Sequence, residues 1–443
     1  MTDLRERARE AHPQAREAVA DLVRIPSVSA PGFDHAEVRR CAEAVASRYE
    51  TAGLGAVRLL ETEGGQPAVY GELEGPPGSP TVLLYAHHDV QPPGDAADWD
   101  SPPFEPVERE GRLFGRGSCD DKAGVALHES TLLVHGARPP VGIKMFIEGE
   151  EEIGSPKLPD FLEVHGELLK ADVIVLSDAT NWRAGVPGLT TRLRGLVDCV
   201  VEVRTLEHAV HSGMYGGPFP DAITVLARLI ATLHDEKGNV AIEGLHTSPT
   251  DALDLTEKEL REQAGALSGL EMIGEGALTE RLWTRPAVSV LGIDAPRIQE
   301  ASNQIVPVAR AKVSLRIAPG DEPGRAMDAL VAHLEARVPW GAEVRVTRGA
   351  AAWPFAVNAT GPIYEAALSA FEEAWGSPAL EIGAGGTIPF VQAFAGAYPE
   401  ASILLTGVED PDGRAHGANE SLLLSDFEKI CLAEALLLER LAD

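Results

Sequence analysis

The sequence is poor in cysteine and in basic residues, and each shortage excludes a class of protein. The four cysteines are scattered and form no CxxC pair or zinc-finger spacing. Such a pattern predicts no disulfides and favours a cytoplasmic location. Lys and Arg number 38 against 68 Asp and Glu, which gives a formal net charge of −30. Nucleic acids and anionic membranes attract basic patches, so neither is an expected partner.

Long apolar runs are also missing. No segment approaches the roughly 18 consecutive apolar residues of a membrane span, and the charged opening MTDLRERAREAH is not expected to be a secretory signal. The chain has 443 residues, of which 44% are hydrophobic and 24% charged. This composition predicts a globular protein of two or three domains with buried cores.

Apolar strands and helices alternate through the first 195 residues. Strands are predicted at residues 81–85, 141–148 and 172–176, and helices at 35–51 and 121–134. This alternation predicts an α/β domain built on a mixed, largely parallel sheet.

The pattern changes near residue 196. Residues 286–291 and 311–317 alternate apolar and polar side chains, as half-exposed antiparallel strands do. An amphipathic helix at 325–337 follows them. We therefore expect a smaller α+β domain at 196–354, inserted between two parts of the larger domain at 1–195 and 355–443.

The segment TVLLYAHHDVQP places two histidines and an aspartate directly after an apolar strand. Alternate residues of an extended chain share a face, so His87 and Asp89 should point one way and His88 the other. A histidine with a neighbouring carboxylate is a common arrangement for a metal ligand and the group that orients it. The alternative is a strand end whose polar residues only meet solvent.

Further acidic and histidine groups follow other predicted strands. Asp120 and Asp121 end the glycine-rich segment GRGSCDDK and could either bind a ligand or cap a helix. The segment EGEEEIGS at 148–155 could be a solvated turn, or it could lie at the sheet edge where α/β proteins bind ligands. Asp178 and His416, each beyond a strand, could be ordinary loop residues. Together these groups form a donor set suited to Zn²⁺, Mn²⁺ or Co²⁺.

Five motifs, in order and at compatible spacing, resemble those of the M20 metallopeptidases, and the resemblance extends from about Leu22 to Glu420. The motifs are His87-x-Asp89-Val90-Gln91-Pro92, Gly115-Arg116-Gly117-x-x-Asp120-Asp121-Lys122, Glu148-Gly149-x-Glu151-Glu152-x-Gly154-Ser155, Ser177-Asp178 and His416-x-x-Asn419-Glu420. The residues of these motifs are most similar to those of the dipeptidase branch. This branch is related to carnosinase, succinyl-diaminopimelate desuccinylase and glutamate carboxypeptidase.

The resemblance implies a catalytic domain with two divalent metal ions, zinc first, with manganese or cobalt as alternatives. Asp120 would bridge the two ions. The remaining implied ligands are His87 and Asp178 for one ion, and Glu152 and His416 for the other. Glu151 would be the general base, since a base that carries a proton must not itself bind the metal, and Asp89 would orient His87. Such a pair of ions can share a bridging hydroxide and stabilise the oxyanion that forms during hydrolysis.

The inserted domain resembles the lid and dimerisation domain of the same family. His211, in the turn HSGxxGG, would reach the active site of the partner subunit in a homodimer and help polarise the scissile carbonyl. Arg316 would bind the carboxylate of the substrate, a task that suits a guanidinium group. Asn303 would face the same site. Gly386 and Thr387 belong to a loop that would hold that carboxylate.

This loop departs from the family pattern. Residues 383–389 read GAGGTIP, where many relatives carry Arg-Glu-Gly-Gly-Ser-Ile-Pro, so Gly383 and Ala384 replace the Arg and the Glu. The metal ligands are unaffected, but the identity of the substrate is left open.

We therefore predict a hydrolase that cleaves the peptide bond of dipeptides or short peptides with a free C-terminal carboxylate. The alternative is an N-acyl-amino-acid deacylase or carboxypeptidase that uses the same metal site. A non-catalytic binding protein on a peptidase fold is the third possibility, and it is disfavoured because Asp120, Glu151 and His416 are all present.

Overall fold

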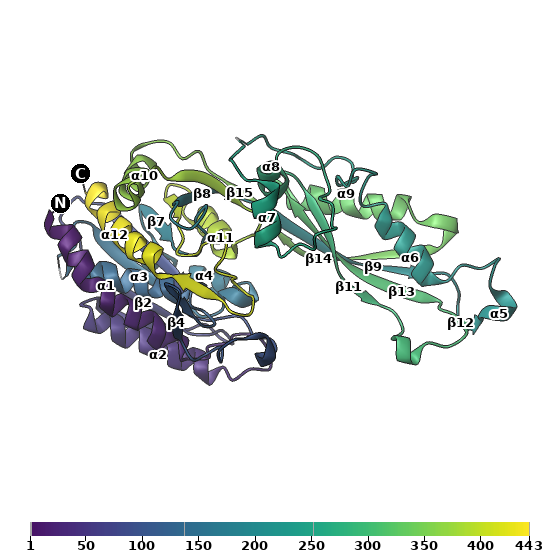
Figure 1. The fold of residues 1–443 in the computed structure, drawn as a ribbon, viewed down its shortest axis with the longest axis horizontal. Helices are drawn as coiled ribbons and strands as arrows, with labels where there is room; N and C mark the ends of the chain where they lie inside the picture. Colours follow the sequence, from purple (N-terminus) through teal and green to yellow (C-terminus); the bar gives the residue numbers. More distant parts are fainter. Residues whose placement is uncertain (1, 137, 251, 443) are drawn as a thin grey trace. The chain divides into compact units, whose positions relative to one another are not determined.

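The structure is a computed structural model that describes residues 2–136, 138–250 and 252–442 (Figure 1). The chain forms two compact units. Unit 1 comprises Met1–Thr191, Asn358–Ile382 and Ile388–Asp443, and unit 2 comprises Arg192–Val357 and Gly383–Thr387. The α/β class with an inserted α+β domain is confirmed. The loop 383–387 groups with unit 2, although it lies in the 355–443 segment of the sequence.

Unit 1 is organised around a mixed sheet in the order β1-β2-β6-β3-β7-β17-β8, with β16 beside β8. Its strands are β1 (Gly55–Leu60), β2 (Ala68–Leu73), β3 (Thr81–His87), β6 (Gly142–Glu148), β7 (Val173–Leu176), β8 (Gly188–Leu193), β16 (Leu380–Ala384) and β17 (Ser402–Leu405). Strand β15 (Phe355–Ala356) falls in the range of unit 2 and pairs with the last two residues of β8, which also fall in that range. The four strands β6, β3, β7 and β17 pair in parallel at the centre. Strands β3 and β7 are apolar and almost wholly buried, as parallel strands covered on both faces are.

The helices of unit 1 cover this sheet. They are α1 (Thr2–Val23), α2 (Ala36–Thr51), α3 (Lys122–His135), α4 (Leu158–Leu169), α10 (Pro362–Trp375), α11 (Pro389–Ala397) and α12 (Leu424–Leu441). Helix α3 packs against α1, α12 and strand β3, which explains why nearly all of its residues are buried. A small sheet contains β18 (Ser421–Leu423), β5 (Arg112–Phe114) and β4 (Val107–Arg109). No helix in the part of the chain described here is long and apolar enough to cross a membrane.

The contacts of Tyr85 identify the face of β3 that packs against helix α11. Its ring contacts Phe390 of α11, with ring centroids 3.6 Å apart, and it also meets Phe146 of β6. Because side chains alternate along a strand, His87 shares the face of Tyr85, whereas His88 shares the opposite face with Ala86. The sheet itself therefore separates the two histidines.

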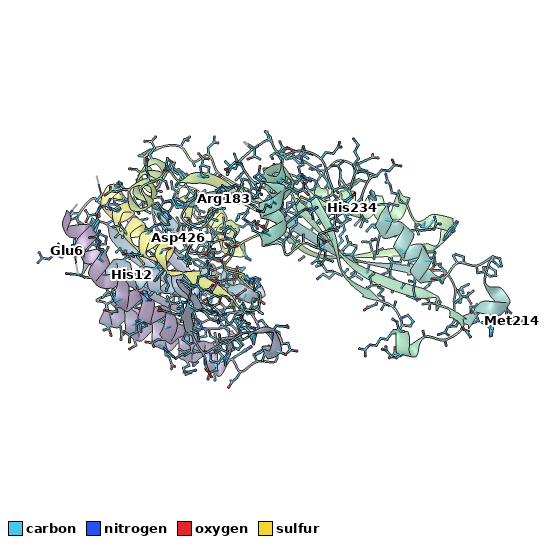
Figure 2. All side chains as sticks on the ribbon, in the orientation of Figure 1. Glu6, His12, Arg183, Met214, His234 and Asp426 are labelled. Atoms are coloured by element: carbon cyan, nitrogen blue, oxygen red, sulfur yellow. The ribbon has the colours of Figure 1, made fainter. Side chains whose placement is uncertain are left out.

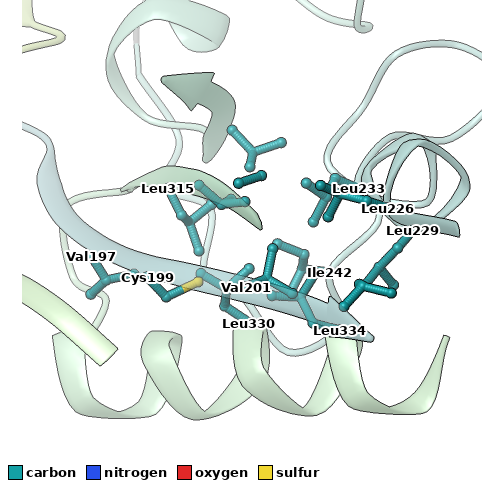
Figure 3. Close-up of a cluster of buried hydrophobic side chains, with 14 of the residues drawn as sticks. Val197, Cys199, Val201, Leu226, Leu229, Leu233, Ile242, Leu315, Leu330 and Leu334 are labelled. Atoms are coloured by element: carbon teal, nitrogen blue, oxygen red, sulfur yellow. The ribbon is translucent and has the colours of Figure 1, made fainter. Parts of the chain in front are cut away.

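Unit 2 contains an antiparallel sheet in the order β11-β13-β9-β14. Its strands are β9 (Gly195–Arg204), β11 (Ala287–Asp294), β13 (Val308–Ile317) and β14 (Glu343–Ala352). Helices α6 (Ala222–Ala231) and α9 (Pro323–Ala336) pack on the sheet, and leucines and valines of both form the core (Figure 3). The alternating pattern at 311–317 arises from this one-sided burial.

Shorter elements complete unit 2. They are β10 (Val210–His211), β12 (Gln304–Ile305), α5 (Ser212–Tyr215), α7 (Glu257–Gln263) and α8 (Leu278–Trp283). Strands β10 and β12 pair with each other and form a separate small sheet. Helix α5 and β12 lie together at one end of unit 2 in Figure 1.

Candidate active site

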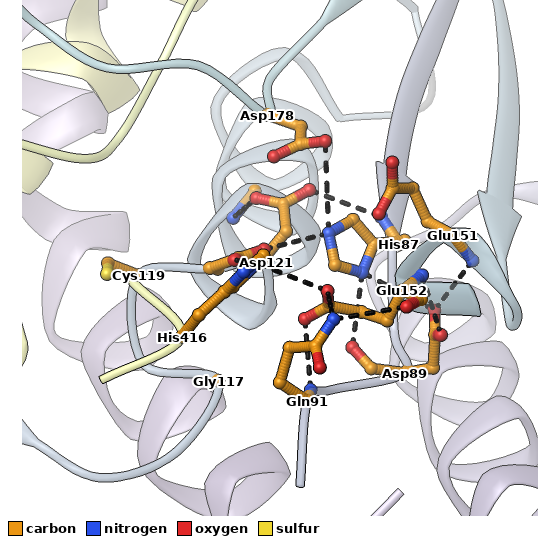
Figure 4. Close-up of polar contacts among 12 residues, drawn as sticks. His87, Asp89, Gln91, Gly117, Cys119, Asp121, Glu151, Glu152, Asp178 and His416 are labelled. Atoms are coloured by element: carbon orange, nitrogen blue, oxygen red, sulfur yellow. Dashed lines mark hydrogen bonds and ion pairs between the residues drawn. The ribbon is translucent and has the colours of Figure 1, made fainter. Parts of the chain in front are cut away.

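The predicted ligands of unit 1 converge at one edge of the sheet (Figure 4). His87 is the last residue of β3, Asp178 follows the parallel strand β7, and Glu151 and Glu152 follow β6. The carboxyl ends of neighbouring parallel strands meet at the same edge, which is where open α/β sheets bind ligands. His416 reaches the same place from the loop that follows β17.

Asp120 lies between the two imidazoles. The His87 Nε2 atom is 3.0 Å from Oδ1 of Asp120, and the His416 Nε2 atom is 2.9 Å from Oδ2. Each oxygen of one carboxylate therefore faces a different histidine. This is the arrangement that a carboxylate shared by two cations requires.

Each histidine also lies near a second carboxylate, a different one for each. The His416 Nε2 atom lies 3.2 Å from Oε2 of Glu152, and His87 Nε2 lies 3.9 Å from Oδ2 of Asp178. The structure thus brings all five predicted ligands together and pairs them as the sequence analysis expected. Their roles in metal binding stay predictions.

The electrostatics of the cluster fit a cationic occupant. Hydrogen bonds to Asp120 and Glu152 raise the pKa of His416 to about 11. Burial would lower the pKa of His87, but contacts with Asp120 and Asp89 raise it well above its ordinary value. The carboxylates therefore need positive charge beside them, and two divalent cations bound by the same nitrogens and oxygens would supply it.

Asp89 fixes the segment that carries both glutamates. Its Oδ1 accepts the backbone N–H of Glu151 at 3.2 Å, and its Oδ2 accepts that of Glu152 at 3.1 Å. The Ser29 hydroxyl donates to Oδ2 at 2.6 Å. The same carboxylate lies 3.4 Å from the His87 Nδ1 atom. Asp89 therefore fixes the turn that carries both glutamates, and its role in orienting His87 stays a prediction.

The adjacent glutamates diverge. Gln91 donates through Nε2 to Oε2 of Glu152 at 2.7 Å and through its backbone N–H to Oε1 at 3.0 Å. Glu151 instead lies with His87 and Asp178, and its carboxylate accepts no hydrogen bond within the described residues. Burial, with the nearby carboxylates adding to it, raises the pKa of Glu151 to about 8. A carboxyl group that accepts no hydrogen bond from the described residues and has a raised pKa is suited to carry a proton.

Two motif residues serve the fold instead. Asp121 caps helix α3 by accepting the backbone N–H of Gly124 at 3.1 Å, so the capping interpretation holds for Asp121 while Asp120 faces the cluster. The His88 Nε2 atom lies 2.9 Å from the Pro67 carbonyl oxygen, on the face away from His87.

A buried ion pair joins two motifs that are about 300 positions apart in the sequence. Arg116 donates to Oε2 of Glu420 at 2.6 Å and to the His416 carbonyl at 3.1 Å. The other carboxylate oxygen of Glu420 accepts the backbone N–H of Cys119 at 3.0 Å and that of Asp120 at 3.2 Å. One glutamate therefore positions both Asp120 and the loop that carries His416.

In unit 2, Arg316 lies beside the loop predicted to hold a carboxylate. Its Nη1 atom donates to the Thr387 hydroxyl at 3.1 Å, and that hydroxyl donates to the Arg194 carbonyl at 2.6 Å. Arg194 in turn donates through Nε to the Gly385 carbonyl at 3.3 Å. Burial and the charge of Arg316 lower the pKa of Arg194 to about 10. Gly386 is exposed on this loop.

The glycines of this loop leave space for side chains that pack against it. A Cβ atom at Gly385 would lie 2.6 Å from the Arg194 guanidinium, so a larger residue there would require the end of this side chain to shift. A Cβ at Gly383 would lie 2.6 Å from the Trp283 ring of α8. Trp283 thus fills the space that a side chain at position 383 would need, which accounts for one departure from the family motif.

His211 and Asn303 lie at the opposite end of β13 from Arg316. Strand β10 pairs with β12, and the Ser212 N–H donates to the Asn303 carbonyl at 3.0 Å. Both side chains are exposed, and neighbouring Met214 is 74% exposed (Figure 2). From Val308 to Arg316 the strand runs roughly 26 Å at its usual rise. Within one chain, unit 2 therefore does not bring together its five predicted site residues, which are His211, Asn303, Arg316, Gly386 and Thr387.

Sequence reasoning missed two residues of these clusters, Glu409 and Arg194. Oxygens of Asp120, Asp178 and Glu409 lie within 4.8 Å of one another. Burial, with the charge of Asp120 adding to it, raises the pKa of Glu409 well above its ordinary value. The rule that located Asp178, an acidic residue after a parallel strand, would have found Glu409 as well. Arg194 gave no such signal, because its environment comes from the distant loop 383–387.

Fold and cluster together indicate a hydrolase of two compact units with a candidate site for metal ions. Residues 83–440 match the family model of peptidase family M20/M25/M40, and the chain belongs to this metal-dependent family. It is 34% identical to the cysteinylglycine-S-conjugate dipeptidase of Corynebacterium striatum over 91% of this chain and 90% of that protein. It is 29% identical to the Cys-Gly metallodipeptidase dug1 of Schizosaccharomyces pombe over 92% and 91% of the two chains. The chain is thus a hydrolytic enzyme of the M20 dipeptidase branch.

Solved structures share the fold. The di-peptidase Dug1p from Saccharomyces cerevisiae superposes with a TM-score of 0.84 at 24% identity, covering 100% of this chain and 98% of that one. Human carnosine dipeptidase 1 gives a TM-score of 0.82 at 24% identity, with 99% and 98% covered.

Proposed function

We propose that this enzyme is a metallodipeptidase that hydrolyses dipeptides, or short peptides, with a free C-terminal carboxylate. The observation that carries the proposal is the Asp120 carboxylate, whose two oxygens face His87 and His416. The names of the relatives, which are Cys-Gly and Beta-Ala-His dipeptidases, support this substrate class. They do not favour the N-acyl-amino-acid deacylase or carboxypeptidase alternative.

The proposed metal site holds two divalent ions. Asp120 would be shared, His87 and Asp178 would hold one ion, and Glu152 and His416 the other. A set of imidazole and carboxylate donors suits zinc, with manganese or cobalt as alternatives. When bound, such ions lower the pKa of water and stabilise negative charge on the carbonyl oxygen.

Glu151 is the proposed proton carrier. Its carboxylate accepts a proton from the attacking water and returns it to the amine that leaves, so no proton need come from solvent. Asp89 holds the backbone of Glu151 in place through the N–H bond described above. This fixed backbone keeps the carboxylate within reach of both reacting groups.

The carboxylate of the substrate is the proposed ligand of Arg316, Thr387 and the exposed Gly386. Arg194 adds a second guanidinium, which donates through Nε to the Gly385 carbonyl of the same loop. Burial and the charge of Arg316 lower the pKa of Arg194, and a bound carboxylate would offset the repulsion between the two cations. An anion is therefore the ligand that these residues favour.

We further propose that the enzyme is a homodimer in the cytoplasm. Because His211 and Asn303 lie at the other end of β13 from Arg316, one small substrate cannot meet all of them in a single chain. A second copy can supply His211 to polarise the scissile carbonyl, and Asn303 beside it. The four cysteines are free thiols, which agrees with a reducing compartment.

A substrate panel tests the function. The protein is loaded with Zn²⁺, Mn²⁺ or Co²⁺ and assayed on dipeptides and on N-acetyl and N-succinyl amino acids. Dipeptides should be cleaved with the higher kcat/KM. Turnover of acylated amino acids alone would show that the deacylase alternative is correct.

A further inference from the structure

Glu409 is part of the unit 1 cluster but has no place in the proposed ligand set. It follows strand β17, and its carboxylate oxygens lie within the 4.8 Å group formed with Asp120 and Asp178. Its backbone is fixed by a parallel bridge to Thr180, and the Asn181 N–H donates to its carbonyl at 2.9 Å. The position of this carboxylate is therefore built into the fold.

The carboxylate of Glu409 has no partner in residues 2–136, 138–250 and 252–442. Asp120 meets two imidazoles, Glu152 is held by Gln91, and Asp178 faces His87. Glu409 accepts no hydrogen bond and forms no ion pair with any described residue. An acceptor with this spare capacity, aimed at the reacting centre, is available to a substrate.

A charge count shows which substrate group fits. Two divalent ions would bring four positive charges, whereas the carboxylates of Asp89, Asp120, Glu151, Glu152 and Asp178 bring five negative charges, while ligated imidazoles would be neutral. Glu409 adds a further negative charge. Each ion would have an imidazole, a carboxylate, a share of Asp120 and a water, which would complete the tetrahedral set that zinc prefers. A further metal ligand is not required, but a positive charge is.

We propose that Glu409 binds the α-ammonium group of the N-terminal residue of the dipeptide. This inference rests on the proposed function and names the group that selects free dipeptides over N-acylated amino acids. The α-nitrogen of a peptide is two covalent bonds, about 2.5 Å, from the scissile carbonyl carbon. A group that binds it must therefore lie at the edge of the metal centre, where Glu409 is. An acylated nitrogen carries no charge and gains nothing from this carboxylate.

The test compares Glu409→Gln with the wild-type enzyme, both loaded with Zn²⁺, on L-alanyl-L-alanine and on N-acetyl-L-alanyl-L-alanine. Glu409→Gln should lower kcat/KM for the free dipeptide about 30-fold or more, because a charge-assisted hydrogen bond is lost. Its rate on the acetylated peptide, or its inhibition by that peptide where turnover is too slow, should stay within about threefold of wild type. Glu409→Asp should recover part of the lost preference.

The second measurement is the zinc content, determined by plasma emission. Wild type, Glu409→Gln and the control Glu400→Gln, which removes an exposed carboxylate of unit 1, should all hold two ions per chain. Loss of one ion in Glu409→Gln would make Glu409 a metal ligand and overturn the proposal. An equal decrease in kcat/KM on the free and the acetylated peptide would also overturn it. If the wild-type enzyme itself cleaves no dipeptide, the proposed function is wrong. The wild-type assay gives this result before any variant is compared, so it is distinct from a failure of the Glu409 proposal.

Discussion

Units 1 and 2 both carry predicted site residues but present them in opposite ways. In unit 1, histidines and carboxylates from several strand ends converge on Asp120, which is buried together with His87 and Asp89. In unit 2, Arg316 and Thr387 lie at one end of β13, while His211 and Asn303 are exposed at the other. The acidic cluster is complete within one chain, whereas the substrate residues form two sets that one chain does not unite.

The difference also concerns charge. The cluster of unit 1 holds an excess of carboxylates and favours cations, whereas Arg194 and Arg316 favour an anion. A dipeptide zwitterion carries one charge of each sign. Under the proposed function, the ammonium group of the substrate would match the carboxylates of unit 1 and its carboxylate would match the arginines of unit 2.

The largest effect is expected from Glu151→Gln in unit 1. Loss of the proton carrier should lower kcat at least about a thousandfold. Because Glu151 is not a proposed ligand, zinc content measured by plasma emission should stay at two ions per chain. His416→Ala is the matched variant, and it should lower the metal content. An active Glu151→Gln enzyme would remove Glu151 as the base.

Arg316→Met should be the most damaging change in unit 2. Loss of the guanidinium should raise KM and lower kcat/KM for dipeptides about 100-fold, since a charged hydrogen bond to the carboxylate disappears. Dipeptide amides, which lack that carboxylate, should be cleaved equally by both enzymes. Equal losses on acids and amides would indicate that Arg316 only stabilises the fold.

His211→Ala tests whether the exposed end of unit 2 serves a second copy. The variant alone should lose roughly tenfold to 100-fold in kcat, because one donor to the developing oxyanion is missing. Mixed with Glu151→Gln and reassembled, it should recover activity, since one of the two sites then has both groups intact. Mixtures that stay inactive would contradict a shared site.

Much of unit 1 could be predicted because its signals are local. The apolar run of β3 identifies a buried strand, and alternation alone separates His87 from His88. Strand β8 was not predicted, because its sequence GLTTRL contains polar residues. Thr190 and Thr191 are nevertheless buried, and the Thr191 hydroxyl donates to the Ile382 carbonyl at 3.3 Å. That burial depends on a strand almost 200 positions away.

The site shows the same limit. Motifs identified the other residues near Asp120, whereas Glu409 belongs to none of the five motifs and could have been found only as an acidic residue beyond a parallel strand. The position of Arg194 against Gly385 depends on the close approach of two distant segments. Sequence patterns located the residues proposed to bind the metal more readily than Glu409 and Arg194, which are proposed to select the substrate.

The smallest expected effect concerns stability and is confined to unit 1. Glu148, at the end of β6, is 1% exposed, and burial raises its pKa to about 7 although the Tyr85 hydroxyl donates to it at 2.8 Å. The folded state thus binds the proton more tightly than the unfolded chain. Its stabilising contribution is therefore full below pH 4.5, the ordinary pKa, and is lost as the pH rises through about 7.

Glu148→Gln should remove this part of the pH dependence. In metal-free protein unfolded with urea at pH 4.5 and pH 8, the decrease in the free energy of unfolding should be smaller in the variant by up to about 3 kcal/mol. The matched control is Glu72→Gln, which changes a half-buried carboxylate that also accepts a tyrosine hydroxyl, that of Tyr70 at 2.6 Å. Because Glu72 is only half-buried, its replacement removes a carboxylate with a smaller burial cost, and its effect on the free energy of unfolding should be smaller than that of Glu148→Gln. An equal effect of both variants would show that burial at Glu148 is not the cause.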